Sequence, residues 1–74
     1  MSKLPQIIPK NLLKFFLKNG FVITRQVGSH VRLAHSDGRK ITVAAHNKPI
    51  APGTFNSILH QSQMSRDEFL KLYK

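Results

Sequence analysis

The histidine with the clearest setting for chemistry is His30, in the stretch "RQVGSHVRL" that runs from Arg25 to Leu33. Gly28 and Ser29 precede it and have the residue types of a tight turn between two strands. Imidazole transfers protons near neutral pH because its ordinary pKa is about 6.5. His30 is therefore either a proton-transfer group or an ordinary residue on a solvated strand.

Metal-assisted chemistry has little support in the composition. Nucleases that use metals need several carboxylates that converge on the cations, whereas this chain has 3 acids, Asp37, Asp67 and Glu68. A zinc site needs three or four protein ligands, but the chain has no cysteine and its 4 histidines are expected on different elements. These histidines are His30, His35, His46 and His60. We predict neither a metal nor another cofactor.

The chemistry that these residues can support is cleavage of RNA without a metal. No acid is placed to orient a histidine as a hydrolase triad requires. In RNA the nucleophile is the substrate's own 2′-hydroxyl, so the protein needs only a proton-transfer group and cations near the phosphate. DNA lacks this hydroxyl and would not be cut in the same way.

The charge of the chain favours a polyanionic partner. Its 12 Lys and Arg residues give a formal net charge of +9, and residues 1–36 contain six basic residues and no carboxylate. Such a field attracts nucleic acid. An acidic protein partner is the other interpretation, and the two do not exclude each other.

The length of 74 residues predicts one domain, residues 1–74, with one small core. No apolar run has the length of a signal peptide or a membrane span. We expect no membrane association and a cytoplasmic location.

The periodicity predicts a helix, three strands and two further helices. Pro9 opens the first helix, whose apolar stripe is expected to contain Leu12, Leu13, Phe16 and Leu17, and Gly20 ends it. Strands are expected over roughly 21–27, 30–35 and 39–46. A second helix follows near Pro52. The pair Ser65 and Glu68 forms a capping box that opens a short last helix.

The pattern of apolar residues also predicts the strand register. A three-residue loop, Ser36 to Gly38, pairs Leu33 with Ile41 and Val31 with Val43, whereas a two-residue loop would pair apolar with polar residues. His30 and Arg32 then share the opposite face with Lys40, Thr42, Ala44 and His46. For the first hairpin, a two-residue turn at Gly28-Ser29 and a three-residue loop that aligns Ile23 with Leu33 both remain open.

The predicted fold class is α+β: α-β-β-β-α with a three-stranded antiparallel sheet, helices on one face, and a short extra C-terminal helix. The other face of the sheet is then open and carries the candidate site. The candidate catalytic residue is His30, and Gly28 is a structural turn residue. The candidate RNA contacts are Lys14, Arg25, Ser29, Arg32, Lys40 and His46.

Three stretches together resemble the HicA toxin family: "NGFVITRQVGSHVRL", "ITVAAHNKPIAPGTFNSIL" and "MSRDEFL". The resemblance covers roughly residues 7–72. It implies a double-stranded-RNA-binding-domain-like fold, cleavage of mRNA with His30 as the catalytic residue, and neutralisation by a HicB antitoxin that covers the catalytic face. Members commonly have proline where this chain has Ala45 and a basic residue near Ala51.

Two other classes of function compete with this interpretation. One is a non-catalytic RNA-binding domain of the same fold, which grips RNA by shape. The other is a small basic adaptor for an acidic protein. A proton donor to complement His30 is also open, with Ser29, Lys40 and His46 as candidates.

Overall fold

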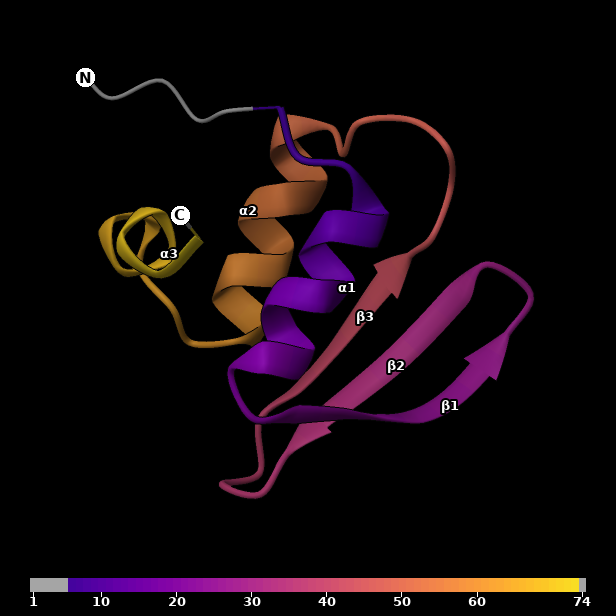
Figure 1. Ribbon diagram of the computed structural model, residues 1–74, viewed down its shortest axis with the longest axis horizontal. Helices are drawn as coiled ribbons and strands as arrows, with labels where there is room; N and C mark the ends of the chain where they lie inside the picture. Colours follow the sequence, from indigo (N-terminus) through magenta and orange to yellow (C-terminus); the bar gives the residue numbers. More distant parts are fainter. Residues whose placement is uncertain (1–5, 74) are drawn as a thin grey trace.

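The computed structural model describes residues 6–73, and its elements follow the predicted order (Figure 1). They are the helix α1 (Pro9–Lys18), the strands β1 (Phe21–Val27), β2 (His30–His35) and β3 (Lys40–Ala44), and the helices α2 (Pro52–Gln61) and α3 (Arg66–Tyr73). The strands form an antiparallel sheet in the order β1-β2-β3. The predicted α+β fold class is confirmed.

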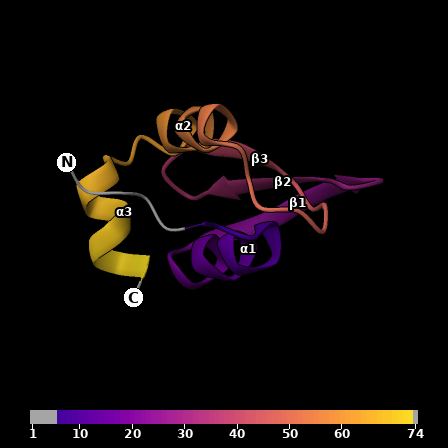
Figure 2. The ribbon, with the colours of Figure 1, turned by 90° about the horizontal axis from the view of Figure 1, so that it is seen from above.

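The elements are stacked in layers. Figures 1 and 2 show α1 and α2 side by side on one face of the sheet, with α3 beyond them on the side away from the strands. The second face of the sheet has no helix over it in the described part of the chain. No helix within residues 6–73 combines the length and apolar character needed to cross a bilayer.

The core lies between the sheet and the helices. Buried side chains come from all six elements and from the segment before α1. They are Ile7, Leu12, Phe15, Phe16, Phe21, Val31, Leu33, Ile41, Val43, Phe55, Ile58, Leu59 and Phe69.

The buried stripe of α1 differs from the predicted one. Leu17 is 44% exposed, whereas Phe15 is buried. The reason is the position of α3: the ring of Phe15 lies 4.7 Å from that of Phe69 and 5.8 Å from that of Tyr73, measured between centroids. Because α3 packs beside α1, the side of α1 that faces α3 is buried in addition to the side that faces the sheet.

The first hairpin combines the two arrangements that the sequence left open. Val27 pairs with His30, so the turn has two residues, and Gly28 has a φ of +59°, as the first position of a type II′ turn requires. Ile23 nevertheless pairs with Leu33, because a β-bulge between Ile23 and Arg25 adds one residue to β1.

The second hairpin has the predicted three-residue loop and register. Leu33 pairs with Ile41 and Val31 with Val43, and Gly38 has a φ of +101°. Asp37 closes the loop by accepting hydrogen bonds from the backbone N–H of Arg39 at 3.0 Å and from its Nε at 2.8 Å. These hydrogen bonds hold the pKa of Asp37 below its ordinary value, and the bond from the Arg39 backbone N–H has the larger effect.

The third strand is shorter than predicted. It was expected to reach residue 46 but ends at Ala44. The Ala45 N–H donates to the Ser29 carbonyl at 2.6 Å, and the His46 N–H turns back to the Ala44 carbonyl at 3.0 Å. This local turn directs the chain away from the sheet, so the prediction that His46 belongs to the strand is wrong.

Gly20 provides a direct test of the junction between α1 and β1. Its φ is +93°, and a Cβ atom there would lie 2.7 Å from His35 Nε2. We expect Gly20→Ala to lower the free energy of unfolding by about 1–3 kcal/mol. Gly53→Ala is the matched control, because a Cβ at this helical position meets nothing within 4 Å. Chemical denaturation of both variants checks this, and equal stabilities would contradict the assigned strain.

Candidate functional site

Two strands display alternating side chains that separate the core from an open face. Val31 and Leu33 of β2 are buried, whereas His30 and Arg32 between them are exposed. The same alternation on β3 buries Ile41 and Val43 and exposes the side chains of Lys40 and Thr42. We call the exposed face that carries His30, Arg25, Arg32, Lys40 and Thr42 the open face.

His30 is held at one end of the open face by the turn before it. It pairs with Val27 of β1 on one side and with Ala44 of β3 on the other. The carbonyl of the preceding Ser29 accepts the Ala45 N–H, which ties the turn to the end of β3. The His30 side chain is exposed, and no hydrogen bond from residues 6–73 restrains its ring. The imidazole is therefore accessible to a ligand from solvent.

The open face concentrates positive charge. Arg25 and Arg32 are directly opposite each other in the sheet, and both are exposed. Such neighbours have Cβ atoms about 5 Å apart, and like charges at this spacing destabilise the sheet. A bound anion would relieve this repulsion, so the pair is suited to a phosphate group.

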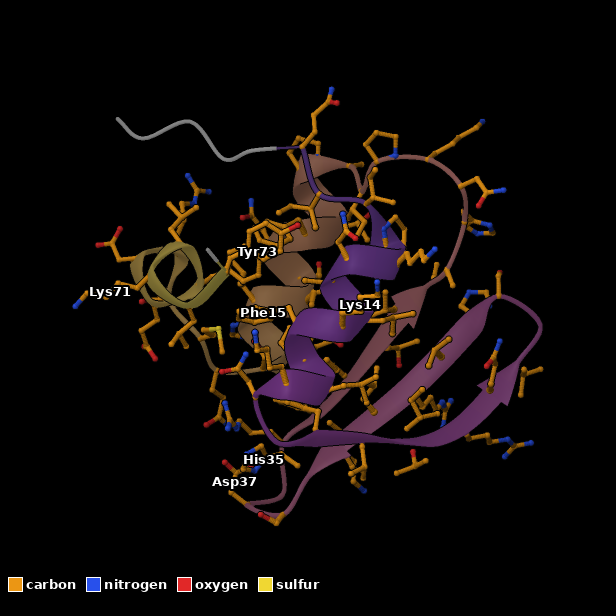
Figure 3. All side chains as sticks on the ribbon, in the orientation of Figure 1. Lys14, Phe15, His35, Asp37, Lys71 and Tyr73 are labelled. Carbon is orange, nitrogen blue, oxygen red and sulfur yellow. The ribbon has the colours of Figure 1, made fainter. Side chains whose placement is uncertain are left out.

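The acids lie away from this face. Asp37 is at the β2–β3 hairpin, at the end of the sheet opposite the Ala44 end of β3, where it contacts Arg39 (Figure 3). Asp67 and Glu68 are in the first turn of α3, on the far side of the helices. The described residues therefore place no carboxylate on the open face, which keeps its potential positive.

The six predicted RNA contacts do not form one cluster. Arg25, Arg32 and Lys40 lie on the open face, and Ser29 is in the turn beside His30. Lys14 lies on α1, near Tyr73 of α3, on a different surface (Figure 3).

His46 is the remaining candidate, and its place was decided by the loop that follows β3. It is exposed and lines a cavity of about 400 Å³ between this loop, α1 and α2. No local sequence pattern predicts this cavity, because its walls come from segments far apart in the chain.

The sequence also does not predict how the free edge of β3 is covered. The Thr42 N–H points away from β2 and donates to Gln61 Oε1 of α2 at 3.2 Å. This side-chain hydrogen bond occupies a donor that would otherwise be free to pair with another strand. No periodicity in the sequence identifies Gln61 for this role.

The histidines and acids do not gather at one point. Within residues 6–73, no group of three His, Asp or Glu side chains has the spacing to hold a metal ion. His35 accepts the Asp37 N–H at its Nδ1, at 3.2 Å, beside the second hairpin.

Comparison with protein-family models identifies the family of this chain. A family model described as the HicA toxin of bacterial toxin–antitoxin systems matches residues 9–64, about three quarters of the chain. The chain belongs to the HicA toxin family. This HicA toxin is accordingly the toxin of a toxin–antitoxin system and pairs with an antitoxin. A search of curated proteins found no match.

The open face of the HicA toxin should bind polyanions more strongly than its other basic surfaces. Arg32→Glu and Lys14→Glu change the net charge equally, but only Arg32 lies on that face. We expect Arg32→Glu to weaken binding of a short single-stranded RNA more, and to lower the slope of log affinity against log salt by about one. Fluorescence anisotropy at several salt concentrations measures both. Equal losses in the two variants would mean that net charge, not the open face, determines binding.

Proposed function

We propose that this HicA toxin is a metal-independent endoribonuclease, an mRNA interferase, that cleaves mRNA and thereby inhibits translation and growth. His30 is its catalytic residue, and residues 1–74 act as one toxin domain in the cytoplasm. The observation that carries the proposal is the exposed His30 at the end of a face where residues 6–73 place Arg25 and Arg32 and no carboxylate.

The proposed reaction uses the 2′-hydroxyl of the RNA. His30 accepts the hydroxyl proton as the 2′-oxygen forms a bond to phosphorus, and the bond from phosphorus to the 5′-oxygen breaks. The leaving 5′-oxygen takes up a proton from a second group or from water, and the products are a 2′,3′-cyclic phosphate and a 5′-hydroxyl. Arg32 and Arg25 stabilise the added negative charge on the phosphoryl oxygens.

The positions of Ser29, Lys40 and His46 relative to His30 support different roles for them in the proposed reaction. His30 is opposite Ala44, whereas Lys40 is four residues further along β3, about 13 Å away at the usual rise of a strand. Lys40 is therefore suited to a neighbouring phosphate rather than to the reacting one. Ser29 and His46 lie at the same end of the sheet as His30 and remain the candidates for protonating the leaving oxygen. Lys14 acts only through the long-range field.

Replacement of His30 tests the proposed activity. We expect purified wild-type toxin to cleave RNA in excess chelator and to leave 2′,3′-cyclic phosphate ends, and His30→Ala to lose at least about 100-fold in rate. The exposed site should limit the change in stability to about 0.5 kcal/mol.

His60→Ala is the matched control, since His60 is an exposed histidine on α2. An RNA with one 2′-deoxynucleotide at the cleavage position should stay intact. Full activity of His30→Ala would overturn the catalytic assignment, whereas RNA that is bound and never cut by wild type would identify a non-catalytic binding domain.

We further propose that the antitoxin is HicB-like, acidic where it meets the toxin, and seated over His30 and Arg32. The support is the antitoxin pairing of the family together with the exposed, basic open face. Complementary charge accelerates the association of such partners, and contact with the open face would exclude RNA sterically.

Protection of the toxin in the complex tests this arrangement. Hydrogen exchange should slow at the β1 and β2 amides, and oxidative footprinting should show His30 protected. Lys71 on α3 lies away from the sheet and should stay reactive to acylation (Figure 3). A neutralising antitoxin that leaves His30 accessible would require an indirect mechanism of inhibition.

A further inference from the structure

The cavity beside His46 opens at the same end of the sheet as His30. It is bounded by the end of β3, the loop to α2, the first turn of α1 and the first two turns of α2, and has a volume of about 400 Å³. Ala44 lines this cavity and is also the residue opposite His30 in the sheet. Opposite residues in a sheet are about 5 Å apart. One edge of the cavity, at Ala44, is therefore about one strand spacing from His30, and its helical walls lie around the end of β3 on the other side of the sheet.

The lining of the cavity matches the chemistry of a nucleobase. Pro49 and Ile58 provide apolar surface, and His46 provides an aromatic ring at the rim. Asn47 offers an amide donor and acceptor, and Thr54 offers a hydroxyl. Proteins read single-stranded RNA by this combination: an unstacked base stacks on a flat side chain and hydrogen-bonds through its edge.

The charge and size of the cavity also fit a base that is attached to a phosphate backbone. The described residues that line it include no carboxylate, and Lys48 adds a cation. Small-molecule sites in proteins have volumes of about 300–1,000 Å³, so this cavity is large enough to admit a single base.

We propose that this cavity binds one unstacked nucleobase of the RNA next to the bond that His30 cleaves, and thereby selects the cleavage sequence. The inference rests on the proposed ribonuclease function and adds the site of base recognition. His46 then stacks on the base, while Asn47 and Thr54 contact its edge. The other candidate role of His46, protonation of the leaving oxygen, passes to Ser29 or water.

An abasic scan on a cleavage-deficient toxin tests this site. The main site of wild-type cleavage is mapped first, and RNAs of that sequence are made with one abasic nucleotide at each position around it. With His30→Ala toxin, we expect one abasic position to weaken binding about tenfold, the size of one lost stacking interaction. The other positions should have small effects.

Variants in the cavity then connect that position to the protein. Adding Thr54→Leu, which fills the cavity, or Asn47→Ala, which removes the amide, should abolish the difference between intact and abasic RNA. Asn11→Ala is the matched control for Asn47, because Asn11 is exposed on α1 and lines a different groove, near α3. Thermal unfolding verifies that each variant is folded. If Thr54→Leu does not fold, the result for Asn47→Ala decides the test.

The outcomes separate the base site from the ribonuclease activity. The base site is overturned if no abasic position weakens binding more than the others, or if neither cavity variant changes the pattern. In either case, His30-dependent cleavage by wild-type toxin would still support the ribonuclease activity. Absence of His30-dependent cleavage overturns both. NMR shifts at Asn47 and Thr54 that appear with antitoxin but not with RNA would assign the cavity to a protein side chain instead and also overturn the base site.

Discussion

The pairing register of β2 with β3 is the constraint on which the rest of the structure depends. Because side chains alternate along a strand, the pairs of Leu33 with Ile41 and Val31 with Val43 bury four apolar residues under α1 and α2. The same alternation requires His30 to face outward. A shift by one residue would expose the core and bury the cations, so stability and the location of the candidate site follow from one set of hydrogen bonds.

The open face combines a stable frame with an unfavourable charge distribution. Arg39 stabilises the sheet at its hairpin end. Its side chain donates hydrogen bonds to Asp37 and, at 2.8 Å, to the Ser62 carbonyl, and its guanidinium lies over the Phe21 ring. Within residues 6–73, no acid forms an ion pair with the opposed Arg25 and Arg32. An anionic ligand or an acidic partner surface would relieve the repulsion between these two side chains.

Local rules predicted much of this fold. The alternation of apolar residues along β2 and β3 predicted how these strands pair. Pro9, Gly20 and the Ser65–Glu68 capping box marked the ends of helices. The capping box is present, with the Glu68 N–H donating to Ser65 Oγ at 3.1 Å. The first hairpin was left open because the bulge after Ile23 adds one residue, and its cost depends on the surrounding sheet rather than on local propensity.

The sequence by itself determined the order of elements, the two faces of the sheet, the place of His30 and the family. Only the tertiary structure decided that Lys14 lies away from the open face, that Phe15 rather than Leu17 is buried, and that His46 leaves the sheet to line a cavity. The physical reason is the range of the interactions. Periodicity records which side of one element is apolar, whereas these positions depend on packing between segments that are distant in the chain.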